Sequence, residues 1–181
     1  MVKYIYDYKR GENMAGYVIH IAVAQEYLRK HNKEYNRDFI LGSVLPDLTT
    51  DKSKTHYGKS PAYTNLKNFL LSNDLLTELN KGEFVHLITD YLFYNHYLEY
   101  FSKKDIYNDY DISNKNIIEK YNVKLLDEIK DTVFFKEGEM KVLNFPLIYK
   151  LIDEISDLDL EKVKKEVLDD NKKWNYYKNI V

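Results

Sequence analysis

The chain has 181 residues, of which 44% are hydrophobic and 31% are charged, and its formal net charge is -2. This composition predicts one soluble globular domain, and a net charge so close to zero disfavours nucleic acid as a partner. Cysteine is absent, which excludes disulfides and thiolate ligands, so any metal ion must be held by histidine, carboxylate or backbone groups and water.

Helical periodicity dominates the first part of the chain. It predicts a helix over about residues 15–31 and a second, short helix that begins at Arg37. Pro46 disfavours helical backbone at the residue before it, so this second helix is expected to end between residues 42 and 45. A polar loop is expected to follow over residues 45–59.

The next two helices carry recognisable start signals. Ser60 can cap a helix over residues 60–73, because Pro61 suits the first helical position. Either Asn73 or Asp74 is expected to cap the helix after it, since both residue types accept hydrogen bonds from the free N–H groups of a first helical turn.

That helix is expected to bend at Gly82 and to continue to about Lys103. Four further segments complete the pattern: a loop over residues 105–114, one or two helices over 116–135, a helix over 145–156, and a helix over 160–177 capped by Asp159. Few segments alternate with period 2. The predicted fold is therefore all-α, a single-domain helical bundle over residues 1–181.

Two of the five histidines lie in the apolar stretch GEFVHLITDYLFYNH, residues 82–96, with an aspartate between them. His86 and Asp90 are four residues apart and share one helix face, whereas His96 lies about 80° around the helix from His86. A buried histidine and a buried carboxylate are costly unless they are compensated. The two side chains can satisfy each other, or a metal ion can satisfy both.

Three further candidate ligands precede this stretch, and each has an ordinary structural interpretation when it is taken alone. His20, inside the apolar face of the first helix, can be a satisfied core residue. Asp47, after Pro46, can be a turn residue or a helix cap, and His56 can be a solvated loop residue. The ordered pattern of four histidines and two aspartates favours a metal site over these separate interpretations.

The order of these residues resembles the zinc-dependent phospholipase C family, an all-helical family of metal-dependent phosphodiesterases. The resemblance covers roughly residues 14–114 and is carried by His20, by the motifs LGSVLPDL, THYGK and GEFVHLITDYLFY, and by His96. It implies that Asp90 bridges two metal ions and that His20 binds the first of them. Asp47, His56 and His86 would complete the second site, and His96 would belong to a third, outer site.

The resemblance also implies the chemistry, a hydrolysis of phosphoric esters with metal-bound hydroxide as nucleophile. Two or three zinc ions are expected, although manganese and iron also suit imidazole and carboxylate ligands. Asp47 and Asp90 are the predicted catalytic residues, and the predicted substrate is a small phosphoester or a phospholipid headgroup.

Two family features differ in this sequence. The secreted enzymes use an N-terminal tryptophan as a ligand, whereas the only tryptophan here is Trp174. The His-x-x-x-Glu of the outer site is also missing, and Asp109 or Asp111 lies near its place. Each of these two aspartates has an alternative interpretation as a turn residue that accepts backbone N–H bonds.

Two other functions remain as alternatives. One is a phosphohydrolase of the HD-domain class, although the adjacent His-Asp pair that marks this class is absent. The other is a non-catalytic binding module that holds one metal ion or none. No apolar run reaches the roughly 18 residues of a membrane span, and the N-terminal segment has no signal-peptide core. We therefore expect a cytoplasmic protein without a stable membrane anchor, of undetermined oligomeric state.

Overall fold

Nearly every residue of the first helix, α1 (Tyr17–Lys30), is buried between Tyr17 and Leu28. A helix that is apolar on all sides must be covered on all sides, and α1 is accordingly packed against helices α2, α5, α6 and α7. The hydrophobic core forms around it. The computed structural model describes residues 16–179, so residue 15, where the first helix was expected to begin, lies outside the described part.

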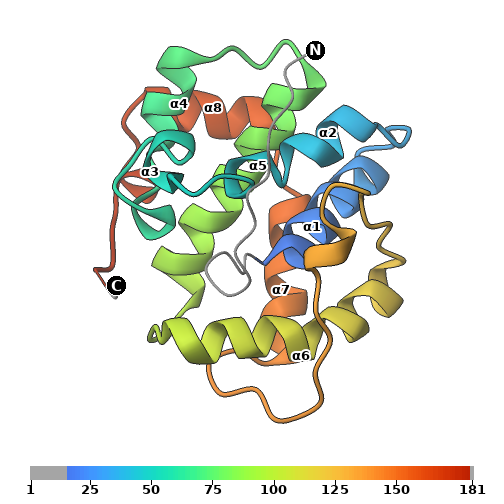
Figure 1. Cartoon of the computed structure of the whole chain (residues 1–181). Coiled ribbons are helices and arrows are strands. Elements are labelled where there is room, and N and C mark those ends of the chain that lie inside the picture. Colours follow the sequence, from blue (N-terminus) through green and yellow to red (C-terminus); the bar gives the residue numbers. More distant parts are fainter. Residues whose placement is uncertain (1–15, 180–181) are drawn as a thin grey trace.

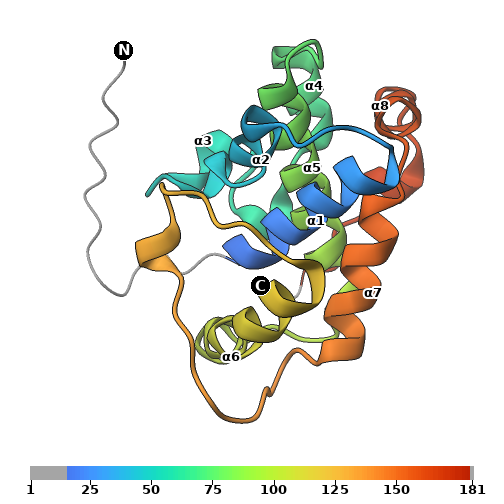
Figure 2. The ribbon, with the colours of Figure 1, turned by 90° about the vertical axis from the view of Figure 1, so that its right-hand side faces the viewer.

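Within residues 16–179 the structure has eight α-helices and no strand, which confirms the predicted all-α fold (Figure 1). After α1 the helices are α2 (Arg37–Gly42), α3 (Lys52–Thr55), α4 (Leu66–Ser72), α5 (Glu78–Leu92), α6 (Lys103–Tyr121), α7 (Phe145–Ser156) and α8 (Leu160–Leu168). Helix α6 lies at one end of the molecule, and α4 and α8 lie together at the other, in both views (Figures 1 and 2). None of these helices is long and apolar enough to cross a membrane.

Two glycines allow α2 and α5 to pack backbone against backbone. A Cβ atom on Gly82 would lie 2.0 Å from the carbonyl oxygen of Phe39, and one on Gly42 would lie 2.2 Å from the carbonyl oxygen of Leu79. The prediction of a bend at Gly82 was wrong, because α5 continues as a regular helix through this residue. The glycine serves close packing, and this packing holds the segment after α2 against α5.

Helix α5 begins and ends at other residues than the sequence predicted. Its N-cap is Thr77, which accepts a hydrogen bond from the backbone N–H of Asn80, rather than Asn73 or Asp74. It ends at Leu92 instead of Lys103, and a π-helical turn follows over Phe93–Tyr97. The buried amide of Asn95 donates to the carbonyl oxygen of Tyr91 at 2.9 Å. Such a side chain competes with the regular helical hydrogen bonds.

The expected loop over residues 105–114 is helical and forms the first half of α6. Asp109 is fully buried there and accepts hydrogen bonds from the backbone N–H groups of residues 141–143, at 3.0, 2.7 and 2.8 Å. The helix ends at Tyr121, because Asn122 adopts a left-handed conformation. The predicted helix over residues 116–135 is therefore only half right, since after α6 only Lys130–Thr132 form a 3₁₀ turn there.

The remaining helix boundaries and caps match the predicted ones only in part. The polar loop over residues 45–59 contains the short helix α3 and a 3₁₀ turn, Leu45–Asp47. Asn65, not Ser60, caps α4, because residues 61–63 form a separate 3₁₀ turn. Helix α7 occupies the predicted residues. Asp159 caps α8 as predicted, although α8 ends at Leu168 rather than near residue 177.

Candidate metal centre

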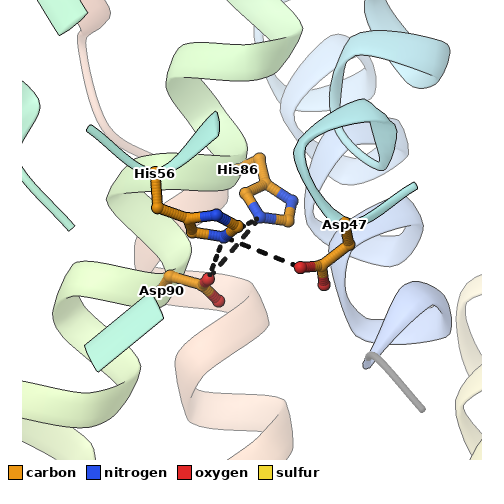
Figure 3. Close-up of side chains that lie close together, drawn as sticks. All are labelled: Asp47, His56, His86 and Asp90. Atoms are coloured by element: carbon orange, nitrogen blue, oxygen red, sulfur yellow. Dashed lines mark hydrogen bonds and ion pairs between the residues drawn. The ribbon is translucent and has the colours of Figure 1, made fainter. Parts of the chain in front are cut away.

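The predicted ligands come together from four parts of the fold. His20 lies on α1, Asp47 ends the 3₁₀ turn after α2, His56 follows α3, and His86 and Asp90 lie on α5. All five residues are buried. Figure 3 shows the side chains of the last four residues pointing toward a common centre, although they enter from different elements.

His56 lies at the middle of this group. Its Nε2 atom is 3.0 Å from Oδ2 of Asp90, 3.1 Å from Nε2 of His86 and 3.6 Å from Oδ1 of Asp47. One donor atom from each of these four residues lies within 4.8 Å of the other three. Four nitrogen and oxygen donors at this spacing can surround a single metal ion.

Backbone carbonyls orient both imidazoles of this group. Nδ1 of His86 lies 2.8 Å from the carbonyl oxygen of Ser43, and Nδ1 of His56 lies 3.0 Å from that of Lys52. A carbonyl oxygen can only accept, so each Nδ1 carries a proton and donates it. In the neutral ring the lone pair then resides on Nε2, which faces the centre. Metal-binding histidines are commonly fixed in this way.

The donor set fits a divalent cation. With neutral rings, two imidazole lone pairs and two carboxylates point at one another inside the protein, which is unfavourable without a positive charge between them. Two nitrogen and two oxygen ligands are a common donor set for zinc, and they also suit manganese and iron. The side chains of the four residues could therefore bind zinc without help from any other group.

Both carboxylates are held in the charged form. Burial acts to raise the pKa of Asp90. The neighbouring His86 and the surrounding histidines, which can donate to Asp90 from Nε2 when no metal ion is bound, outweigh burial and hold this pKa well below its usual range. Burial also acts to raise the pKa of Asp47, and the ammonium of Lys52 together with His86 outweighs it, so this pKa is lowered. Two negative charges therefore face the centre near neutral pH.

His20 approaches the opposite oxygen of Asp90. Its Nε2 lies 3.3 Å from Oδ1 of Asp90, whereas His56 and His86 lie nearest to Oδ2. The ring of His20 stacks on that of His86 with centroids 3.9 Å apart, and its buried Nδ1 has no hydrogen-bond partner among the described residues. Asp90 thus turns Oδ2 toward His56 and His86 and Oδ1 toward His20. A carboxylate shared between two ions is arranged in the same way. The second ion remains a prediction.

His96 is not brought into this group. Its side chain is exposed, and its ring contacts those of Tyr91 and Tyr176, at centroid distances of 5.8 and 6.0 Å. The two aspartates near the place of the missing outer-site motif are engaged elsewhere. Asp109 accepts hydrogen bonds from backbone N–H groups, and Asp111 forms an ion pair with Lys136 at 2.7 Å. In the part of the chain that the structure describes, only the four-residue group has metal-binding spacing, and the outer site remains a prediction.

A cavity of about 610 Å³ opens beside the candidate metal centre. His20, Asp47 and Asp90 line it, and its aromatic wall consists of Tyr94, Phe101, Tyr107 and Tyr110. Burial raises the pKa of Tyr94 and of Tyr110 well above the usual value, with the nearby carboxylates adding to the effect. Both hydroxyls are therefore neutral and able to donate hydrogen bonds.

Sequence reasoning missed one further cavity residue, Lys52. Its ammonium nitrogen lies 2.7 Å from Oδ1 of Asp47, and its side chain lines the cavity. A lysine in a polar segment is usually solvated. The available signal was its spacing, five residues after Asp47 and four before His56.

Comparison with known proteins supports the chemistry that these donors suggest. The family model described as zinc dependent phospholipase C matches residues 17–145 of the chain. This match confirms the resemblance found in the sequence and extends it beyond residue 114. No curated protein and no solved structure matches the chain.

Proposed function

Because the chain belongs to the zinc-dependent phospholipase C family, we propose that it is a metal-dependent hydrolase of phosphoric esters. One observation carries the proposal: two oriented imidazoles and two charged carboxylates converge beside a cavity of about 610 Å³. When bound there, a divalent ion supplies Lewis acidity toward a phosphoryl oxygen and lowers the pKa of a water ligand.

The residues of the centre would have different roles, according to whether they line the cavity. His56 and His86 do not line the cavity, and their hydrogen bonds to backbone carbonyls hold their rings in place. Asp47 and Asp90 line the cavity, so the open side of the centre, where a phosphoester would enter, is the side of the carboxylates. The neutral hydroxyl of Tyr110 lies on the same cavity wall and can donate to an oxygen of the ester.

Zinc is the metal that the family and the donor set support best. We propose that the centre holds two ions. The first ion would take Asp47, His56, His86 and Oδ2 of Asp90. A second would be held by His20 and Oδ1 of Asp90, with water or further donors completing its coordination.

We further propose that the substrate is a soluble phosphoester rather than phospholipid in a bilayer. Attack on a bilayer usually needs a basic or amphipathic surface that holds the enzyme on the membrane. The formal net charge is -2, and the exposed side of α8 and its C-cap mixes Lys162 and Lys165 with Glu161 and Asp169. This mixed face gives no basic patch.

A non-catalytic module is the second candidate, and one observation favours it. Four protein donors can complete a tetrahedral zinc site, as in structural sites, whereas catalytic zinc sites keep a position for water. A centre that holds only this one saturated ion would stabilise the fold without hydrolysing an ester.

The test begins with elemental analysis of protein purified without chelator. Zinc-loaded protein is then assayed with bis(p-nitrophenyl) phosphate and, in parallel, for release of phosphocholine from liposomes. We expect turnover of the soluble diester, lost by at least about 100-fold in Asp90→Asn, and retained in the control His31→Gln, whose histidine lies outside the centre. Faster turnover of liposomes would contradict a soluble substrate. A full metal content without activity on either substrate would favour the non-catalytic module.

A further inference from the structure

Lys52 is built into the cavity wall more firmly than an ordinary surface lysine. Its side chain is 19% exposed, whereas that of Lys54 in the same short helix is 83% exposed. Its ammonium nitrogen lies 2.7 Å from Oδ1 of Asp47, a carboxylate that is itself only 5% exposed. The positive charge of Lys52 is thus held at the edge of the candidate metal centre.

The ammonium and a metal ion would compete for the same oxygen. Oδ1 of Asp47 is the atom that Lys52 contacts, and it is also the carboxylate atom that faces Nε2 of His56 at 3.6 Å. With a divalent ion held between Asp47 and His56, the ammonium of Lys52 would be repelled and would lose its carboxylate partner. The flexible four-carbon stem of lysine allows the ammonium to move away without any change of backbone.

The cavity is the place to which the displaced ammonium can move. Lys52 lines it together with both carboxylates of the centre. A phosphoester that binds a metal ion on this side brings negatively charged oxygens next to the ammonium, and lysine binds phosphate as a point charge.

We propose that Lys52 binds a phosphoryl oxygen of the substrate, exchanging its ion pair with Asp47 for this contact when Asp47 binds the metal ion. The inference rests on the proposed function of the same site, and it adds a group that positions substrate and balances its charge. The backbone carbonyl of Lys52 has a separate task, because it accepts the Nδ1 proton of His56. Substitution of the side chain leaves that bond in place.

The experiment compares wild type with K52M, K52R and the matched control K54M, and it uses two binding measurements instead of activity. The affinity of metal-stripped protein for zinc is measured by competition with a chelator. The affinity of stoichiometrically loaded, dialysed protein for inorganic phosphate is measured by calorimetry. Thermal unfolding verifies that each variant is folded, and K52Q replaces K52M if the latter does not fold.

The inference predicts opposite shifts in the same variant. K52M should bind zinc about tenfold more tightly, because a competing cation is gone, and phosphate about tenfold more weakly. K52R should retain most of the phosphate affinity, and K54M should change neither affinity by more than about twofold. If K52M weakens both affinities, Lys52 only holds Asp47 in place and the inference is wrong. Unchanged phosphate affinity also overturns it.

Binding of two further ligands distinguishes a soluble phosphoester from a lipid headgroup as the source of the phosphoryl group. Binding of dimethyl phosphate that depends on Lys52 assigns the contact to soluble phosphoesters, and binding of phosphatidylcholine vesicles that depends on Lys52 assigns it to lipid headgroups. Either result supports the contact itself. If wild type shows this phosphate binding but hydrolyses no ester, the proposed function fails while the inference about Lys52 stands.

Discussion

Replacing Gly82 by alanine tests how the packing of α2 against α5 positions the candidate metal centre. Gly82 has ordinary helical backbone within α5, so alanine alone would favour the helix by about 1 kcal/mol. The added Cβ atom, however, would lie 2.0 Å from the carbonyl oxygen of Phe39 and 3.0 Å from Cα of Gly42. The two effects have opposite signs, and the structure decides which is larger.

The steric effect should dominate, because both contacts are with backbone atoms that no side-chain rotation can move. An ordinary carbon–oxygen contact is longer by about 1 Å or more, so α2 must shift away from α5. Overpacking of this kind costs about 1–3 kcal/mol, and backbone contacts place Gly82→Ala at the upper end. After the gain in helix propensity, a net loss of about 2 kcal/mol remains, which lowers the melting temperature by about 4–8 °C.

The shift should also reach the metal centre, since Ser43 directly follows α2 and its carbonyl orients His86. We expect Gly82→Ala to unfold at a lower temperature than wild type and to bind zinc about tenfold more weakly. Gly42→Ala meets the same interface from the other side, so the double variant should lose less stability than the sum of the two single variants. A rise in the melting temperature of Gly82→Ala would refute the close packing.

Three further outcomes are expected. Asp90→Asn should lose most of its zinc on dialysis, because the substitution removes a negative charge that faces His20, His56 and His86. His96→Ala should retain zinc, and equal retention by Asp90→Asn and wild type would refute the role of Asp90. The pKa values of Asp47 and Asp90 are lowered in the folded protein, so their contribution to the stability of metal-stripped protein is present above about pH 4 and is lost as the pH falls below it. The melting temperature of metal-stripped protein should therefore fall between pH 6 and pH 3, and this fall should be smaller in Asp47→Asn. Asp109→Ala should lower the free energy of unfolding by about 3 kcal/mol in denaturant titrations, because it leaves the backbone N–H groups of residues 141–143 without their acceptor.

The all-α fold was predictable because helical periodicity is a local signal that the sequence carries directly. The four-residue spacing of His86 and Asp90 likewise indicated a shared helix face. The additional approach of Asp47 and His56 depended on the family resemblance, since nothing local relates a loop residue to a helix thirty or more positions further along the chain.

The errors have the opposite origin, in contacts between distant segments. Residues 105–114 look like a loop because they are polar, yet Asp109 is buried by bonds to residues 141–143. Helix α5 was predicted too long because the hydrogen bonds of Asn95 extend as far as the backbone N–H of Lys178. Lys52 was overlooked because its ion pair with Asp47 appears only when α3 folds back onto the preceding turn.

The dispersed origin of the four donors would couple the abundance of this protein to metal supply. The unfolded chain holds Asp47, His56 and the pair on α5 far apart, so it cannot offer zinc the same centre. An ion that binds only the native state stabilises it by about 2.7 kcal/mol at a free concentration 100 times the dissociation constant. With zinc as the bound ion, scarcity of zinc would remove this stabilisation, raise the unfolded fraction and speed the removal of the chain by proteases. The centre would then regulate the lifetime of the molecule as well as its chemistry.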